Sequence, residues 1–405
     1  MKSSLIKLQY ILLTLYIAAI IVFKQYNFNI THFINMFLIA VFIILNLLEK
    51  EHKYKINIVI ILYAFFIIIS LASSLWGVDP DNPSFKSLQL FLILVNMVVI
   101  YNIVKKYNAV DTFFYGILIG SLINYLIMFE VIPVSYDIYM GKGLGARAVG
   151  TMGNPNILTT AMLLSMLVSM LYLYRRESIN KIFYLYQFVN IFMAMYLILL
   201  TVSKKGILLG CLILLMYVFI SIKNKKGIAQ LSALVLFGIV IAQFFLDWTQ
   251  VEFLFEYIDR RFTDFIDSLS SLSHSADSST AIRKRLIEFG LTAFQSSPLL
   301  GHGLDNFRTL TSGQYAHNNP VELLVGVGLL GVVTYYSIHA FLLKKIYAMK
   351  QSELKYILYF FVLSILLMDL TTVSYGGKLI IFSMLYISII AESENKNLYN
   401  HKKTL

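Results

Sequence analysis

The sequence predicts an all-α, polytopic membrane protein with about twelve transmembrane helices. Of its 405 residues, 58% are hydrophobic and only 14% are charged, and the mean hydropathy is +0.74. Because a soluble domain carries about 25% charged residues, a water-soluble globular enzyme is excluded. The one cysteine, Cys211, lies inside an apolar run, so a disulfide scaffold is also excluded, and the same composition excludes an intrinsically disordered chain.

Twelve apolar runs are expected to cross the bilayer, where a helix needs about 20 apolar residues. They lie at residues 8–23, 33–48, 56–75, 87–104, 110–131, 156–174, 182–201, 206–222, 228–246, 320–343, 354–370 and 378–391. The first run does not resemble a cleaved signal, because no small-residue cleavage site precedes Lys24 and eleven runs follow.

Basic residues predict the orientation, because cytoplasmic loops are rich in Lys and Arg. With the N-terminus inside, the inner segments hold far more of these residues than the outer segments, leaving the long loop 247–319 aside. We therefore expect a multi-pass protein of the cytoplasmic (inner) membrane with both termini in the cytoplasm and its functional loops extracytoplasmic. The net charge of +11 is interpreted as this topology signal, so no nucleic-acid partner is expected.

The runs and loops suggest four consecutive segments. Residues 1–131 form the first five helices, and 132–246 form helices six to nine with the outer loops of Arg147 and Lys204. Residues 247–319 form one long extracytoplasmic loop, and 320–405 form the last three helices and a cytoplasmic tail.

The long loop has its own expected structure. Apolar residues at helical spacing predict an amphipathic helix over 251–269 that lies on the outer bilayer surface. A serine-rich linker follows at 268–280, then a second helix at 281–296 and a turn at 298–303.

Arginine is concentrated on the predicted outer side, although the chain as a whole uses mostly lysine. The outer arginines are Arg147, Arg260, Arg261, Arg283, Arg285 and Arg308. Because the planar guanidinium can bind a phosphate through two hydrogen bonds, this bias indicates an anionic, phosphorylated, lipid-linked ligand. The alternative for Arg260 and Arg261 is that they rest the amphipathic helix on lipid headgroups.

Two histidines are candidates for chemistry. His317 lies at the outer mouth of the tenth run, where an imidazole with an ordinary pKa of about 6.5 can accept a proton. The alternative is a plain surface histidine. His302 lies between Gly301 and Gly303, and we expect the backbone shape to matter there more than the ring.

Other charged residues interrupt apolar segments. Lys204 and Lys205 form either the tight outer turn of a helical hairpin or a contact to phosphate. Glu322 lies just inside the tenth run, where an acidic residue suggests a functional role and a nearby arginine is one candidate partner; Asp369 is a similar but weaker case.

Several functions have no matching motif. The sequence contains no His-x-x-x-His pair and no cysteine cluster. The nearest approach to an outer Asp-x-Asp metal site is Asp79-Pro-Asp81, which is expected to form a turn, so metal-independent chemistry is expected. It also contains no phosphate-binding P-loop, so an ATP-driven pump is not expected. No cofactor is expected either.

Over residues 140–340 the order of motifs resembles the superfamily of O-antigen ligases and Wzy-type O-antigen and capsule repeat-unit polymerases. The resembling pieces are Arg147-Ala-Val-Gly-Thr-Met-Gly-Asn-Pro-Asn156, the hairpin Ser203-Lys-Lys-Gly206, Arg283 to Arg285 followed by Ser297-Pro-Leu-Leu-Gly-His-Gly-Leu-Asp-Asn-Phe307, and His317-Asn318 leading into Val321-Glu322.

The resemblance implies a GT-C-like glycosyltransferase that needs neither nucleotide nor metal. Its donor would be a glycan on undecaprenyl diphosphate, and an acceptor sugar hydroxyl would attack the anomeric carbon. Within it, His317, Arg283 and Arg147 would be catalytic. Substrate would also contact Arg285, Lys204, Lys205, Glu322, Asn318 and Arg308. Members commonly carry arginine where this chain has Lys204, which keeps the charge but loses the bidentate geometry.

Polymerase and ligase share these motifs, and we favour the polymerase. A ligase would pass the glycan to a different acceptor, such as a lipid A core or a protein. A lipid-linked oligosaccharide flippase is the alternative from another class, although no internal repeat supports it. A peptidoglycan polymerase lacks a counterpart to the Arg147 and His317 arrangement. Expected partners are the lipid-linked oligosaccharide, the bilayer, and a chain-length regulator and flippase of the same pathway.

Overall fold

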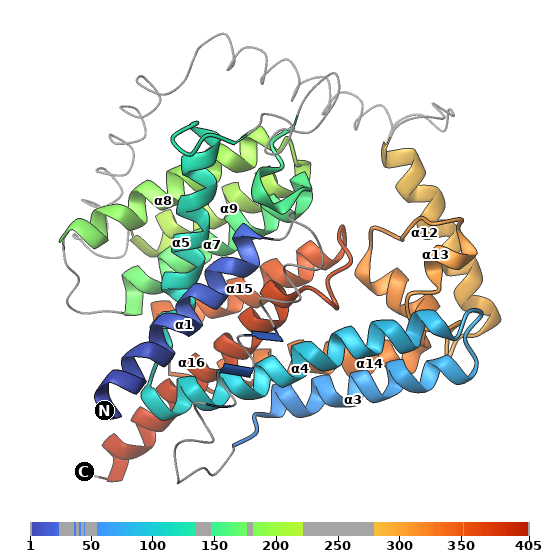
Figure 1. The fold of residues 1–405 in the computed structure, drawn as a ribbon, viewed down its shortest axis with the longest axis horizontal. Coiled ribbons are helices and arrows are strands. Elements are labelled where there is room, and N and C mark those ends of the chain that lie inside the picture. The colour runs from blue at the N-terminus through green and yellow to red at the C-terminus, as the bar shows by residue number, and fades with distance from the viewer. Residues whose placement is uncertain are drawn as a thin grey trace. The chain divides into compact units, whose positions relative to one another are not determined.

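The computed structural model describes residues 2–23, 36–37, 40–41, 44, 55–134, 147–175, 181–221, 279–350 and 352–403. The described chain is helical and contains no β-strand (Figure 1). Seven of the described helices are long and apolar enough to cross a membrane. The predicted class, an all-α polytopic membrane protein, is confirmed, whereas the total of about twelve spans stays a prediction.

The helices begin and end close to the predicted apolar runs. They are α1 (Lys2–Val22), α3 (Ile58–Ala72), α4 (Asp81–Tyr107), α5 (Asp111–Met128), α7 (Pro155–Arg175), α8 (Lys181–Leu200), α9 (Lys204–Ser221), α14 (Asn319–Tyr347), α15 (Glu353–Asp369) and α16 (Lys378–Lys403). The predicted run 228–246 and most of the run 33–48 lie outside the described residues.

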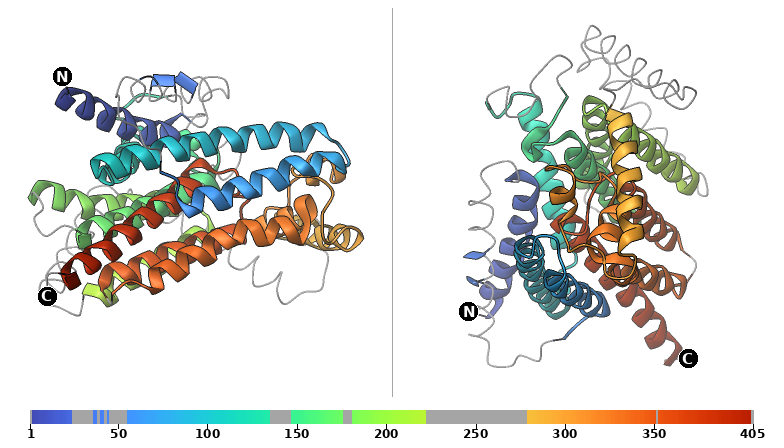
Figure 2. Two further views of the ribbon diagram at one scale, coloured as in Figure 1. Left: turned by 90° about the horizontal axis from the view of Figure 1, so that it is seen from below. Right: turned by 90° about the vertical axis from the view of Figure 1, so that its right-hand side faces the viewer.

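The chain divides into two compact units. The first comprises residues 1–13, 33–112 and 274–405, and the second comprises 14–32 and 113–273. In the first unit α3 packs against α4 and α14, and α14 also contacts α12, α15 and α16. Both panels of Figure 2 show α3 and α4 running side by side. In the second unit α7 packs against α8 and α9.

A buried polar network holds the second unit together. Asn190 on α8 donates to the Oγ atoms of Ser165, at 2.9 Å, and Ser169, at 2.8 Å, on α7. The Tyr125 hydroxyl on α5 donates to the Asn190 side-chain oxygen at 2.9 Å. All four side chains are buried, and polar groups between membrane helices need such partners because lipid offers none.

The helix α12 (Ser279–Ser296) confirms the second helix expected in the long loop. It packs on α14 and on the short helix α13 (Phe307–Leu310) through an apolar cluster that includes Leu286, Phe307 and Val321. A Cβ on Gly290 would overlap the Val321 side chain, so the small residue allows the close approach. The predicted helix 251–269 and nearly all of the serine-rich linker lie outside the described residues.

The helix α14 is broken at Gly328, where φ is 62° and ψ is −166°. The loop after α12 supplies the hydrogen bonds that the break removes: Leu329 donates its N–H to the Pro298 carbonyl at 2.9 Å, and His302 donates to the Val325 carbonyl at 2.7 Å. The predicted run 320–343 is found as α14, which is long and apolar enough to cross a membrane, and the break at Gly328 is an additional feature that the run did not predict. Only glycine fits, because a Cβ would overlap the Leu299 carbonyl oxygen.

Candidate active site

His317 lies in the loop immediately before α14 and has a left-handed backbone, with φ of 53°. This conformation costs a residue with a Cβ about 1–2 kcal/mol. Side chains on both sides hold it in place. The Asn318 side-chain oxygen caps α14 by accepting from Val321 N–H at 3.0 Å, and the Glu322 carboxylate accepts from Ala316 N–H at 2.8 Å.

Asn318 and Glu322 are thus committed to the protein backbone. Asn318 also donates its amide N–H to the Leu370 carbonyl at 3.0 Å. Glu322 is buried, and within the described residues no arginine lies at ion-pair distance from it, so the candidate Glu–Arg pair is not found there. The structure replaces that pair with the contact to Ala316, a backbone interaction that residue types alone do not reveal.

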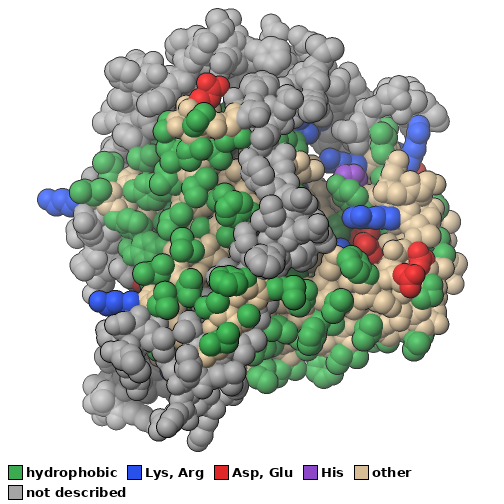
Figure 3. Space-filling model, in the orientation of Figure 1, with side chains coloured by type: hydrophobic (Ala, Val, Ile, Leu, Met, Phe, Trp, Pro, Cys, Tyr) green, Lys and Arg blue, Asp and Glu red, His purple; other side chains and the backbone are tan. Residues whose placement is uncertain are grey.

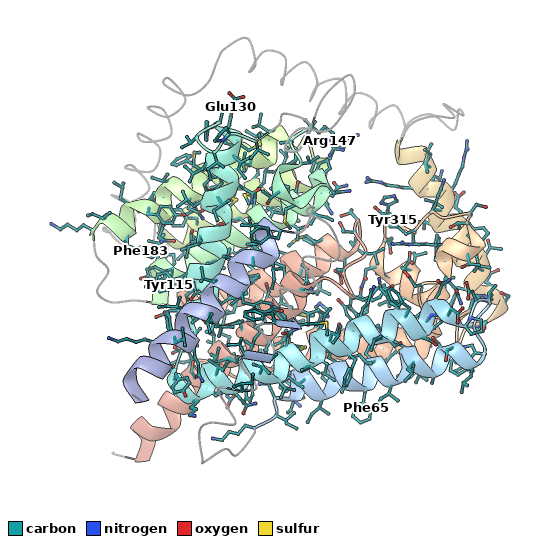
Figure 4. The ribbon with its side chains drawn as sticks, viewed as in Figure 1. Phe65, Tyr115, Glu130, Arg147, Phe183 and Tyr315 are labelled. Atoms are coloured by element: carbon teal, nitrogen blue, oxygen red, sulfur yellow. The ribbon has the colours of Figure 1, made fainter. Side chains whose placement is uncertain are left out.

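Tyr315 and Arg308 lie next to His317, in that order. The Tyr315 ring centroid lies 4.0 Å from that of His317, and the Arg308 guanidinium carbon lies 5.6 Å from the Tyr315 ring centroid. Figure 4 shows Tyr315 in the loop between α13 and α14. The expected site residues His317, Asn318, Glu322 and Arg308 are therefore brought together within the first unit.

Asp305 extends this row. One of its carboxylate oxygens lies 3.9 Å from Arg308 Nε and 4.0 Å from Lys86 Nζ, and it accepts a hydrogen bond from the Tyr375 hydroxyl at 3.3 Å. Lys86 also lies over the Tyr375 ring, 5.4 Å from its centroid. Figure 3 shows basic, acidic and histidine side chains close together beside α12 and α13, whereas much of the other described surface in that view is apolar.

Sequence reasoning did not select Lys86, Asp305 or Tyr375. A lysine at the start of an apolar run and a tyrosine in a short loop carry no motif of their own. The one signal in the sequence is the segment Gly301-His-Gly-Leu-Asp305, whose two glycines indicate a tight turn. In the structure both glycines have positive φ, and Asp305 itself has φ of 66°. That strained turn places the carboxylate.

Two buried polar networks fix these loops. Asn306 is fully buried and donates to the carbonyls of Asp79 and His302, which ties the Asp305 loop to the turn before α4. Asn319 accepts from the backbone N–H groups of Ser374 and Tyr375 at 2.9 and 3.1 Å, which holds the loop between α15 and α16.

Asp369 belongs to the second network rather than to an exposed site. It is buried and accepts hydrogen bonds from Ser374, from the Tyr336 hydroxyl at 3.1 Å and from the Asn319 amide at 3.4 Å. Its role in the structure is to hold the loop that carries Tyr375.

The two arginines of α12 differ in placement. Arg283 is half-buried and lies one turn before the buried Leu286, on the helix face that packs toward α13 and α14. Arg285 is exposed and lies on another face. Of these two arginines, only Arg283 lies on the face of α12 that packs on α13 and α14.

The ring of His302 lies at the end of α12. Its Nε2 atom is 2.9 Å from the Ala293 carbonyl and 3.1 Å from Ser296 Oγ. Gly301 and Gly303 have φ of 69° and 97°, and a Cβ on Gly301 would lie 2.7 Å from the Gly326 carbonyl. The turn requires the two glycines, and the ring of His302 caps the end of α12.

The second unit contains its own basic cluster. Arg147 donates from Nε to the Thr201 carbonyl at 2.6 Å, and Ala148 N–H donates to the Leu200 carbonyl at 3.0 Å. Residues 201–203 form the turn between α8 and α9, which confirms the tight hairpin, and the half-buried Lys204 and Lys205 begin α9. Figure 4 shows Arg147 in this unit, beside these helices.

This arrangement suits an anion, because the N-terminus of a helix carries partial positive charge and free N–H groups. The glycine of the hairpin motif has a structural role: a Cβ on Gly206 would overlap the Thr159 methyl group, so α9 approaches α7 closely here. Within the described residues, no group of three His, Cys, Asp or Glu side chains could hold a metal ion.

Part of the chain matches a known protein family. Residues 188–336 match the family model described as O-antigen ligase. No curated protein matches the chain. The matched stretch contains the α8–α9 hairpin, α12, α13 and the His317 loop, whereas Arg147 and Lys86 precede it. The resemblance to the superfamily of O-antigen ligases and Wzy-type polymerases is thereby confirmed.

Proposed function

We propose, from the match to the O-antigen ligase family, that this membrane protein is a polysaccharide repeat-unit polymerase. The family supports glycan transfer of the ligase or polymerase type. The proposal adds a donor glycan on undecaprenyl diphosphate and an acceptor sugar hydroxyl on the outer face of the cytoplasmic membrane. The observation that carries it is the left-handed backbone of His317, whose neighbours are fixed by the hydrogen bonds that Asn318 accepts from Val321 and Glu322 accepts from Ala316.

In this reaction His317 acts as the general base. The acceptor oxygen forms a bond to the anomeric carbon, and the bond between that carbon and the phosphate oxygen breaks. The acceptor proton passes to the imidazole, and the lipid diphosphate leaves with the electron pair. A positioned base contributes about 10²- to 10⁴-fold to the rate, and a fixed backbone lowers the cost of orienting the imidazole.

Cationic side chains stabilise the charge on the leaving diphosphate. Arg283 is the candidate on α12, and Arg147 with Lys204 is the candidate in the second unit. Preorganised cations and N–H groups are the usual means of stabilising such a developing charge. Because the donor is already activated, no step calls for a metal or a cofactor.

The proposed topology follows the distribution of basic residues. Both termini lie in the cytoplasm, and the His317 loop lies on the extracytoplasmic side, where the lipid-linked glycan is presented. A chain-length regulator and a flippase of the same pathway are the proposed protein partners.

The break in α14 favours a flippase as the second candidate, because transporters use discontinuous helices at their substrate sites. In this chain, however, the loop 298–302 already occupies the break and hydrogen-bonds its backbone groups. A transferase needs a base in a fixed position, which accounts for the constrained backbone of His317, whereas a flippase does not need such a base.

The test is the size of the surface glycan in a deletion strain that carries the native gene or none. A polymerase predicts single repeats without the gene and long chains with it. Long chains that remain on undecaprenyl diphosphate in the deletion strain would instead indicate a ligase. Loss of every lipid-linked repeat from the outer leaflet would indicate a flippase.

A further inference from the structure

Lys86 and Arg308 share the single carboxylate of Asp305 without forming a close ion pair with it. Their nitrogen atoms lie 4.0 and 3.9 Å from the same oxygen, whereas a charge-assisted hydrogen bond measures about 2.7–2.9 Å. Within the described residues, neither side chain donates a hydrogen bond to the protein. The donors of an ammonium and a guanidinium therefore remain available beside the carboxylate of Asp305.

The side chains of Lys86, Asp305 and Arg308 are partly exposed, and the buried Tyr375 packs against them. The side chains of Lys86 and Asp305 are each 21% exposed, and that of Arg308 is 52% exposed. Tyr375 is fully buried beneath them, with its hydroxyl on Asp305 and its ring under Lys86. Burial raises the pKa of the Tyr375 phenol well above its usual value, and the Asp305 carboxylate raises it further, so the phenol remains a neutral donor.

The cluster is connected to the proposed base. Arg308 lies over one ring of the Tyr315–His317 pair, and α13 and the short loop after it carry all three residues. A group bound between Lys86 and Arg308 would therefore lie beside the aromatic surface of Tyr315, which can pack against the apolar face of a sugar ring.

We propose that Lys86 and Arg308 form a binding subsite for an oxyanion of the substrate. The Asp305 carboxylate, which lies close to both cations, balances part of their charge. The ligand is a phosphate oxygen of the lipid diphosphate or the carboxylate of an acidic sugar. The inference rests on the proposed glycan transfer and adds a specificity element to it. It also places Lys86, which precedes the matched stretch 188–336, in the substrate site.

The subsite predicts opposite effects for neighbouring substitutions. In K86Q one of the two cations is lost, so an anion should bind at least tenfold more weakly. In D305N the competing negative charge is lost while a hydrogen-bond acceptor for Tyr375 remains, so the same anion should bind several-fold more tightly. If Asp305, Lys86 and Arg308 only stabilise the fold, both variants should lose binding together with thermal stability.

The experiment measures binding to the purified full-length protein in detergent by titration calorimetry. The probes are inorganic pyrophosphate, which mimics the lipid diphosphate, and glucuronate, which mimics an acidic sugar. K86R tests whether the charge suffices, and K284Q, at an exposed lysine of α12, is the matched control. Melting temperatures in the same detergent identify variants that fail to fold.

Weaker binding in K86Q, tighter binding in D305N and native binding in K284Q support the subsite. The probe that responds identifies the source of the oxyanion. Native affinity in a folded K86Q, weaker binding in a folded D305N, or no binding of either probe to the native protein overturns it. The proposed transfer is judged separately: in H317A the subsite should still bind the probe, whereas the rate of glycan transfer should fall about 10²- to 10⁴-fold.

Discussion

Replacement of Glu322 should impair catalysis by releasing the backbone of His317. In E322A the N–H of Ala316, which is fully buried, loses its acceptor, and an unsatisfied buried donor costs about 1–3 kcal/mol. His317 meanwhile retains a left-handed backbone that costs about 1–2 kcal/mol and keeps only the Asn318 cap on its other side. The loop is therefore expected to relax and to move the imidazole away from its working position.

The size of the effect follows from these energies. If about 1.4–2.7 kcal/mol of positioning is lost, the rate falls about 10- to 100-fold, because about 1.36 kcal/mol corresponds to a factor of ten. E322Q retains a side-chain oxygen that can accept from Ala316, so its rate should fall by less than about tenfold, the difference between a charge-assisted and a neutral hydrogen bond.

The assay is the initial rate of glycan polymerisation in proteoliposomes loaded with the lipid-linked repeat. Both variants should lower kcat while KM stays near the native value, because Glu322 contacts the protein backbone rather than substrate. A folded E322A with native kcat would refute the reasoning. A folded E322Q as slow as E322A, with a raised KM, would show that the carboxylate contacts the substrate directly.

The structure supports two further comparisons with matched controls. G328A should lower the melting temperature and the yield of folded protein, because a Cβ there overlaps the Leu299 carbonyl, whereas G313A has a similarly positive φ but no atom within 4 Å and should lose only the backbone term of about 1 kcal/mol. Equal effects would remove the packing argument for the break in α14. R283Q should reduce polymerisation far more than R285Q, because only Arg283 lies on the α12 face toward the His317 loop, and the reverse order, read from glycan length in a complemented strain, would reassign the arginine.

The helices could be predicted closely from the sequence because the physical signal is local. An apolar run of sufficient length between polar loops has few alternatives in a membrane, and the bounds of α7, α8 and α14 differ from the predicted runs by one to a few residues. The hairpin between α8 and α9 and the helix α12 followed from the same kind of local pattern.

The break in α14 could not be predicted in this way, because it depends on a second segment. Gly328 leaves the helical conformation where the loop 298–302 supplies hydrogen-bond partners. The residues of the apolar run do not indicate that this loop packs against them. Glycines are frequent in membrane helices, so their presence alone does not indicate a break.

Tertiary structure also decides which of the candidate site residues lie close together, and this the sequence could not predict. His317 and Arg308 carry recognisable side-chain chemistry and were selected from their placement. Asp305, Lys86 and Tyr375 come from three segments far apart in the sequence, and only the tertiary structure brings them together. Glu322 was selected from the sequence as a candidate site residue, but its hydrogen-bond partner is a backbone N–H, which no residue pattern encodes.

The central claim, that His317 is the general base, is tested most directly by single-turnover glycan transfer with purified H317A in proteoliposomes. The account predicts a rate about 10²- to 10⁴-fold below that of the native protein, the range expected for loss of a general base, with an unchanged melting temperature and native binding of inorganic pyrophosphate. A folded H317A that transfers glycan at the native rate would contradict it and leave His317 as a surface residue.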